Sequence, residues 1–341
     1  MVSKDTPAMP SEEQDTGSSA VILAYSRIDE DSFTQTSLRL SDFEAHLEEL
    51  KSGGYNIMSL LDVIKALKEN APLPEKTVAL TFEGGYKSAF TRAMPLLLDH
   101  NIPFTVFYAS NNAEMDTGEY MNWEDLKSLQ RYKNVSLGIL PSSYQRVTNN
   151  SKSENKRYLN NAKIAYRKHF KDEATLASYP FGQHNESYKT LIKNSGIEAA
   201  FGLQSGVAYS GMDFMNIPRF PMTDGYGDLQ RFRMVANALP IPAKDIEPAD
   251  HVLTSSTPLF GFSVDNDSAH LLKATTCFIA GQGQAQTFLA GDNRLEIRPA
   301  HPLDDSRVRI NCTATSGSAE EPKLHWLGML YTLAEPLSLQ D

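Results

Sequence analysis

The sequence predicts an α/β barrel followed by a small all-β domain, and two patterns carry this prediction. Up to about residue 222, short apolar runs alternate with segments of helical period, which is typical of βαβ units around a parallel sheet. The seven or eight strands that fit this stretch favour a closed barrel over an open sheet. From residue 258 onward, short alternating strands separated by Gly, Asn and Asp favour a β-sandwich.

The first half of the barrel begins with a short strand and continues with strands and helices in turn. In the first helix Phe43, Leu47 and Leu50 share one face, and Ser41 with Glu44 has the spacing of a capping box. The expected strands cover residues 21–25, 55–58, 77–82 and 104–108, and the expected helices cover residues 41–51, 59–68, 89–99 and 122–130. Asn122 is the expected cap of the last of these helices.

The second half of the barrel repeats the alternation and then gives way to a proline-rich stretch. Strands are expected at 135–138, 176–179 and 199–202, and helices at 153–169, 188–195 and 228–239. Four prolines and a Ser/Thr run between residues 240 and 258 indicate a linker. We therefore expect a disordered leader (1–19), a barrel domain (20–240), a linker (241–257) and a sandwich (258–341) with strands at 260–264, 276–280, 294–298, 308–312 and 325–331.

Composition excludes some classes of protein. The net charge is −10, which argues against a general electrostatic footprint for nucleic acid. There is no apolar run of transmembrane length. The first residues lack the apolar core of a signal peptide, so the protein either is cytoplasmic or has had a signal or anchor removed. Of these two, we expect the second, with a periplasmic or extracellular location. Cys277 and Cys312 are expected on strands that face each other, close enough to bond, and two buried thiols remain the alternative.

Several ordered motifs between residues 20 and 235 resemble those of one enzyme family. The stretch TVALTFEGGY at 77–86 resembles the T-F-D-D-G motif of the polysaccharide deacetylases (carbohydrate esterase family 4, NodB homology). The stretch ASYPFGQHN at 177–185 resembles the third motif of that family, and IPRFPM at 217–222 resembles a late strand that carries an arginine. The resemblance implies a distorted (β/α) barrel of the NodB type.

The family cleaves the acetamide of N-acetylated sugars with a divalent metal, often zinc, held by one Asp and two His. The resemblance places Glu83 at the position of the general base and Gly84 at that of the metal-binding Asp. Leu140 and Tyr144 fall at the two histidine positions, and no histidine occurs between His100 and His169. Leu cannot bind a metal, and a phenol with a pKa near 10 is a poor ligand. We therefore expect no metal or other cofactor.

The motif residues that bind the sugar in this family are retained more fully than the metal ligands. By resemblance, the expected substrate-binding residues are Tyr86, Tyr179, Pro180, Phe181, Gly182, Asn185 and Arg219. Arg219 is further expected to form a buried salt bridge with Glu83. His184, inside the third motif, is expected to be a loop histidine that faces solvent.

These observations favour a polysaccharide deacetylase-like protein that has lost catalysis and still binds carbohydrate, namely an N-acetylglucosamine-based exopolysaccharide of the biofilm type. Two alternatives stay open. One is an active hydrolase of carbon–nitrogen bonds that deacetylates polysaccharide through Glu83 or through another metal site. The other is a structural or interaction module whose contact surface is the sandwich.

Overall fold

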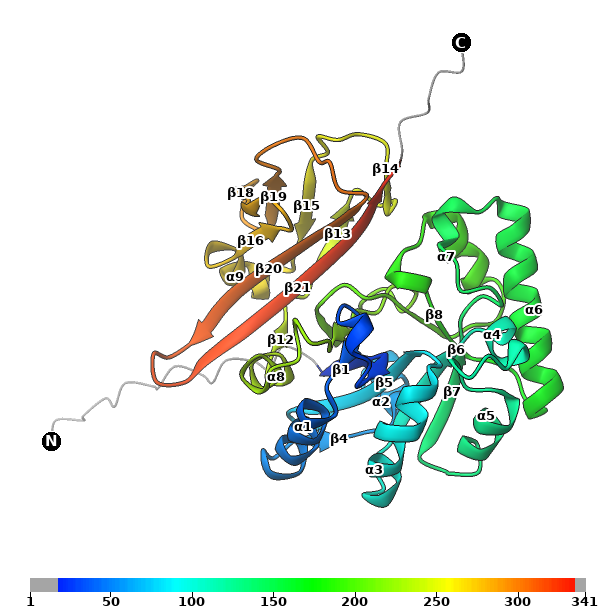
Figure 1. The fold of residues 1–341 in the computed structure, drawn as a ribbon. Coiled ribbons are helices and arrows are strands. Elements are labelled where there is room, and N and C mark those ends of the chain that lie inside the picture. The colour runs from blue at the N-terminus through cyan, green and yellow to red at the C-terminus, as the bar shows by residue number, and fades with distance from the viewer. Residues whose placement is uncertain (1–17, 335–341) are drawn as a thin grey trace, which may run out of the picture.

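The computed structural model describes residues 18–334, so the predicted leader at 1–19 lies almost wholly outside it. The described chain forms a barrel with surrounding helices and a second, all-β unit beside it (Figure 1). The long hairpin β20–β21 of the second unit runs along the side that faces the barrel (Figure 1). None of the helices in residues 18–334 combines the length and the hydropathy of a membrane span.

A curled nine-stranded sheet forms the barrel and confirms the predicted fold class. Its main strand order is β10-β1-β5-β6-β7-β8-β9, and all neighbours are parallel except β10 with β1. An isolated bridge between Phe201 and Ile217 ties the last strand to the segment before β11. The strands are β1 (Ser19–Tyr25), β4 (Asn56–Ile57), β5 (Thr77–Gly84), β6 (Phe104–Tyr108), β7 (Val135–Ile139), β8 (Leu176–Ser178), β9 (Ala199–Phe201), β10 (Val207–Tyr209) and β11 (Phe220–Pro221).

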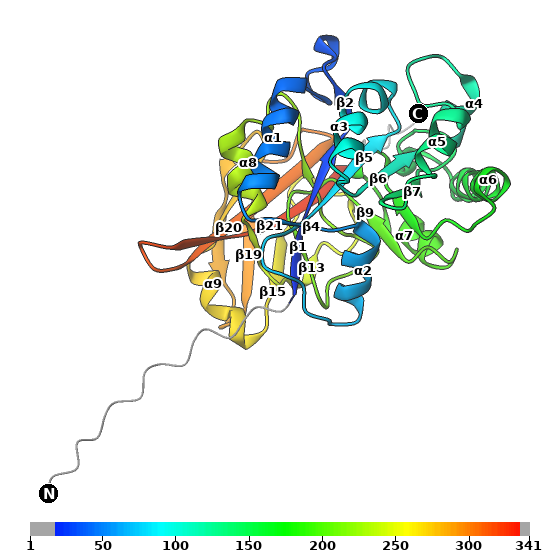
Figure 2. The same ribbon diagram turned by 90° about the horizontal axis from the view of Figure 1, so that it is seen from below.

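Helices pack around the sheet, as Figure 2 shows from below. They are α1 (Leu40–Ser52), α2 (Leu60–Lys68), α3 (Met94–Asp99), α4 (Ser110–Met115), α5 (Trp123–Leu129), α6 (Lys152–Phe170), α7 (Glu186–Lys193) and α8 (Leu229–Ala236). Asn122 caps α5 as predicted. The capping box predicted at Ser41 is wrong, because α1 begins at Leu40 and Ser41 already lies inside the helix.

The interior of the barrel is apolar at one end and polar near the carboxyl end of β5. At one end, Val63, Ile64 and Leu67 of α2 join inward-facing strand residues such as Ala79 and Leu176 in one apolar cluster. Side chains alternate along a strand, so the next inward positions on β5 after Ala79 are Thr81 and Glu83. Both are buried. A polar layer therefore lies above the apolar layer, near the carboxyl end of β5.

Two further sheets make up the all-β unit and share one core. The first contains β12 (Leu239–Pro240), β14 (Val252–Leu253), β16 (Thr276–Ile279), β17 (Gly283–Gln284), β20 (Arg307–Gly317) and β21 (Pro322–Leu333). The second contains β13 (Lys244–Glu247), β15 (Phe260–Ser263), β18 (Gln286–Leu289) and β19 (Arg294–Arg298). A short helix, α9 (Ala269–Lys273), precedes β16.

The stretch expected as a linker, residues 241–257, has strand structure instead. Strand β13 pairs with β15 and strand β14 pairs with β21, so both belong to the sheets of the second unit. The prolines that indicated a linker flank these short strands rather than interrupt them, and short edge strands tolerate nearby proline. The Tyr209 hydroxyl donates to the Ala243 carbonyl (2.7 Å), which joins this stretch to the barrel.

Cys277 and Cys312 form a disulfide bond with a Cα–Cα distance of 4.0 Å. They are direct cross-strand partners on β16 and β20, adjacent strands of one sheet, and both side chains are buried. The bond therefore lies in the core of the all-β unit.

Reduction of this bond is expected to lower the free energy of unfolding by about 3–4 kcal/mol, because it opens a loop of 35 residues in the unfolded chain. Urea unfolding with and without a reductant measures the change. The double variant Cys277→Ala/Cys312→Ala is the control and should not respond to the reductant. If the reductant changes the free energy of unfolding of the wild type as little as that of this control, the prediction is contradicted.

Candidate functional site

Glu83, the predicted general-base position, lies inside the barrel near the end of β5. Its side chain is only 1% exposed. The Oε2 atom accepts hydrogen bonds from the Ser178 hydroxyl (2.8 Å) and from Nη2 of Arg219 (2.9 Å). The Oε1 atom is buried and has no hydrogen-bond partner among the described residues. The salt bridge expected between Glu83 and Arg219 is thus present and is cut off from solvent.

Arg219 links this ion pair to several strands of the sheet through hydrogen bonds and cation–π contacts. Its side chain is fully buried. Nε donates to the Gly202 carbonyl (2.9 Å), and Nη1 donates to the Thr81 hydroxyl (3.3 Å). The guanidinium carbon lies 5.1 Å from the ring centre of Phe107 and 5.7 Å from that of Phe201, in cation–π contact with both. These contacts compensate part of the cost of burying a charge.

Burial raises the pKa of Glu83, while the charge of Arg219 and the hydrogen bond from Ser178 act in the opposite direction. A general base must lie within hydrogen-bond reach of the proton that it removes. Glu83 is engaged by Arg219 and Ser178 and is shielded from solvent. The arrangement is suited to holding the barrel strands together.

The three positions that the family resemblance assigns to the metal ligands, Gly84, Leu140 and Tyr144, do not form a ligand set. Gly84 has a left-handed backbone (φ +91°), and a Cβ atom there would lie 2.5 Å from Cε2 of Tyr86. Leu140 is fully buried in the apolar cluster of the barrel interior. Burial, and then the charge of Glu83, raises the pKa of Tyr144 well above its ordinary value, so the phenol stays protonated. Among residues 18–334, no three His, Cys, Asp or Glu side chains lie together as a metal site.

Two stacked ring pairs lie next to Glu83, and we call Tyr86, Tyr120, Tyr144 and Phe181 the aromatic patch. Tyr86 stacks on Tyr120 with ring centres 5.1 Å apart, and Tyr144 stacks on Phe181 at 4.9 Å. Tyr86 is nearly buried, whereas the other three rings are partly exposed. Sequence reasoning missed Tyr120, because no motif contains it and an isolated bridge brings it to Tyr86 from a separate loop.

Phe181 is the aromatic member of the third motif that is partly exposed. Its backbone is left-handed (φ +59°), which is strained for an aromatic residue and is often seen at functional sites. The neighbouring motif residues hold it there. Gly182 allows close packing, because a Cβ atom would lie 2.5 Å from the Leu203 nitrogen. Asn185 caps α7 by accepting from the Tyr188 amide (2.8 Å).

Most other predicted substrate-binding residues occupy supporting positions. Tyr179, Pro180 and Arg219 are buried, and the Tyr179 hydroxyl donates to the Met215 carbonyl (2.7 Å). Gly182 is also buried. Of the predicted set, Phe181 and Asn185 keep appreciable exposure, and the Asn185 side chain is engaged in its cap.

The expectation that His184 faces solvent is wrong. Its ring is 1% exposed and stacks between Tyr179 and His251, with ring centres 4.3 Å away on both sides. His251 in turn stacks on Tyr331 of β21 and shares a hydrogen bond with the Leu330 carbonyl (2.7 Å). The sequence could not place His184 here, because its neighbour His251 comes from a segment more than sixty residues later. This column of rings joins the barrel to the all-β unit.

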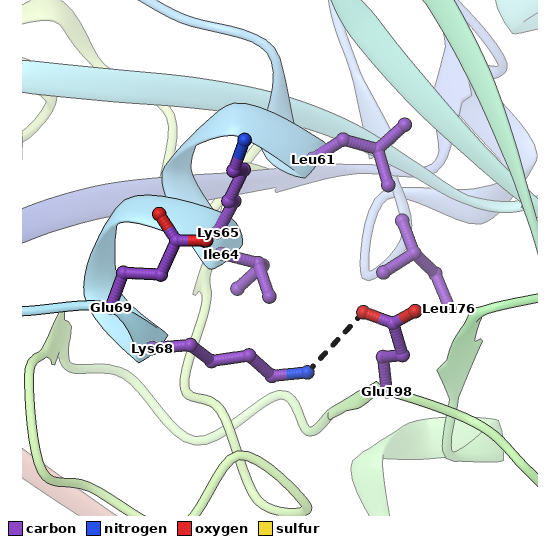
Figure 3. Close-up of a pocket in the computed structure, with 7 residues that line it drawn as sticks. All are labelled: Leu61, Ile64, Lys65, Lys68, Glu69, Leu176 and Glu198. Carbon is purple, nitrogen blue, oxygen red and sulfur yellow. Dashed lines mark hydrogen bonds and ion pairs between the residues drawn. The ribbon is translucent and has the colours of Figure 1, made fainter.

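A shallow pocket of about 290 Å³ lies away from these groups, beside the first residues of β8 and β9 (Figure 3). Lys68 of α2 reaches across it to Glu198 (3.4 Å), and Leu61, Ile64 and Leu176 supply its apolar wall (Figure 3). Its lining contains no aromatic ring and no Ser, Thr, Cys or His side chain. The polar layer and the aromatic patch are therefore the better candidates for function.

Comparisons with known proteins point to one family. Residues 70–200 match the family model described as polysaccharide deacetylase. A poly-β-1,6-N-acetyl-D-glucosamine N-deacetylase of Staphylococcus aureus is 22% identical over 199 residues, which cover 55% of this chain and 68% of that relative.

Solved structures share the fold. The deacetylase PplD of Streptococcus pyogenes, in complex with acetate, has a TM-score of 0.60 at 17% identity and covers 65% of this chain and 99% of its own. IcaB from Ammonifex degensii has a TM-score of 0.56 at 18% identity, with 64% and 96% covered.

The variant Arg219→Met is expected to lower the free energy of unfolding by about 3–5 kcal/mol, because it leaves the Glu83 carboxylate buried without its partner. The double variant Glu83→Leu/Arg219→Met removes both charges and should recover most of this loss. Urea unfolding measures all variants. Arg233→Met is the control, since Arg233 pairs with Glu49 at the surface and should cost less than about 1 kcal/mol. Equal losses for Arg219→Met and Arg233→Met would contradict the structural role.

Stability is expected to fall as the pH drops below about 6.5, the pKa of an unfolded histidine. Burial lowers the pKa of His184 and of His251, and it lowers that of His46 to about 4. The folded state then binds fewer protons than the unfolded state, so protonation favours unfolding as the pH falls toward the folded pKa values.

The variant His184→Phe keeps the ring stack and removes the titrating group, so its stability should depend less steeply on pH between 7 and 5 than that of the wild type. Unfolding in urea at both pH values measures this. His100→Gln changes an exposed histidine and should retain the wild-type dependence. Identical pH dependence in His184→Phe and the wild type would contradict the assignment.

Proposed function

Because residues 70–200 are a polysaccharide deacetylase domain by sequence, we propose that this protein binds an N-acetylated polysaccharide at its aromatic patch and does not deacetylate it. The observation that carries the proposal is the sealed pair of Glu83 and Arg219. The substrate class follows from the named relative, an N-deacetylase of poly-β-1,6-N-acetyl-D-glucosamine.

The residues at the expected general-base and metal positions support a loss of deacetylase activity. The carboxylate that would activate water is buried and paired. Tyr86 occupies the space into which a side chain at position 84 would project, and Leu140 is part of the apolar core. The residues at these positions do not fit a divalent metal, and metal-dependent hydrolysis would therefore lack its ligands here. The alternative of an active hydrolase has no comparable observation in its favour.

Carbohydrate binding is supported by the partly exposed rings. Aromatic faces are apolar platforms with polar tips, which suits the mixed apolar and hydroxylated surface of a sugar. Phe181 has the strained backbone that often accompanies a ligand contact, and Tyr144 buttresses its ring. The disulfide supports a periplasmic or extracellular location, because such bonds persist mainly in oxidising compartments.

Calorimetric titration with oligosaccharides of β-1,6-linked N-acetylglucosamine tests the proposal, together with an assay for released acetate in the presence of added zinc. We expect binding and no acetate. Phe181→Ala should weaken binding about five- to tenfold, because one stacking contact is worth about 1 kcal/mol. Phe288→Ala, which removes a ring that is 43% exposed in the all-β unit, is the control and should bind normally.

Catalytic release of acetate by the purified protein would assign it to the active hydrolases. Absence of binding, or equal binding by the Phe181 and Phe288 variants, would remove the aromatic patch as the binding surface.

A further inference from the structure

Three arginines from the barrel and the all-β unit lie within electrostatic range of one another, near the aromatic patch. Arg146 comes from the loop after β7, and Arg307 and Arg309 come from the start of β20. The protein carries a net charge of −10. Even so, none of the three makes an ion pair with a carboxylate in residues 18–334. We call Arg146, Arg307 and Arg309 the arginine cluster.

Arg307 is the central member of this cluster. It is partly buried, and its Nε atom is buried without a hydrogen-bond partner within the described part of the chain. Arg307 and Arg309 are two residues apart on one strand, so their side chains leave the same face. Burial, and then the positive charges of Arg309 and Arg146, lowers the pKa of Arg307 to about 10, so it stays charged at neutral pH. The carboxylate of nearby Asp305 accepts the Arg307 backbone N–H (2.9 Å).

The arginine cluster borders the aromatic patch directly. The guanidinium carbon of Arg146 lies 5.7 Å from the ring centre of Phe181, and Phe181 stacks on Tyr144. Tyr144 is in turn within electrostatic range of Arg307. A sugar that contacts Phe181 would therefore have its substituents close to the guanidinium group of Arg146.

From this arrangement we infer that the arginine cluster binds the carboxylate of an acidic sugar residue in the polysaccharide that contacts the aromatic patch. Neighbouring positive charges repel one another, and an anionic ligand offsets that repulsion. The planar guanidinium fork matches a carboxylate with two parallel hydrogen bonds. This inference rests on the proposed function and narrows its ligand to a polysaccharide that contains uronic acid.

Hyaluronan octasaccharide, which alternates N-acetylglucosamine with glucuronate, is a suitable probe, and N-acetylchito-octaose is its neutral counterpart. At low salt we expect the acidic chain to bind at least about tenfold more tightly, with an advantage that shrinks as salt screens the charges. The double variant Arg146→Gln/Arg307→Gln should lose this advantage and keep its affinity for the neutral chain. Arg307→Lys, which keeps the charge without the fork, should retain part of the advantage.

The matched control is Arg131→Gln/Arg157→Gln, which removes two exposed arginines outside the cluster and should bind both chains like the wild type. Thermal unfolding of each variant establishes that it is folded. Equal affinity of the wild type for the two chains, or an equal loss of the acidic advantage in the control, overturns the arginine site.

The same titrations separate this inference from the proposed function. Phe181→Ala should weaken both chains, whereas the arginine variants should weaken the acidic chain alone. Binding of the acidic chain only, lost in the Arg146/Arg307 variant, supports the arginine site and overturns recognition of a neutral polysaccharide. Binding of both chains with equal affinity supports the proposed function and overturns the arginine site. Binding of neither overturns both.

Discussion

One buried ion pair, between Glu83 and Arg219, constrains the upper half of the barrel. Its partners come from four places in the chain: Thr81 and Glu83 on β5, Ser178 at the end of β8, Gly202 after β9, and Arg219 before β11. Each of these groups lies in a low-dielectric interior, where a polar atom left without a partner is costly. The strands must therefore keep their mutual register to satisfy the guanidinium. The same contacts remove Glu83 from solvent and so set the limits on any chemistry at this position.

The residues around the pair fit one another as a set. Tyr86 fills the space beside Gly84 that any larger residue at position 84 would need, and Leu140 continues the apolar layer below. A side chain introduced at position 84 alone would contact the Tyr86 ring, and one introduced at position 140 alone would contact the apolar cluster. An aromatic surface lies near the pair, and its member from the third motif, Phe181, has a strained backbone between a close-packed glycine and a helix cap.

The junction between the barrel and the all-β unit is where the remaining polar groups concentrate. The His184–His251–Tyr331 column and the arginine cluster both combine a barrel loop with segments of the second unit. The proposed functions of binding polysaccharide and of selecting acidic sugars thus depend on how the two units are joined. A histidine column of uncharged rings also makes this junction sensitive to acid, because protonation would place charge in a buried stack.

The sequence by itself determined the barrel and the family resemblance, because hydrophobic period and local motifs are carried by neighbouring residues. The pairing of Glu83 with Arg219 and the residues expected at the metal positions followed from that resemblance and not from a local pattern. Only the tertiary structure decided that Tyr179, Pro180, Gly182 and Asn185 support Phe181, that His184 is buried, and that residues 241–257 form strands. It also decided that Tyr120 stacks on Tyr86 and that Arg146 lies within electrostatic range of Arg307. These contacts join segments up to about 160 residues apart, and no local pattern encodes which distant side chains the folded chain brings together.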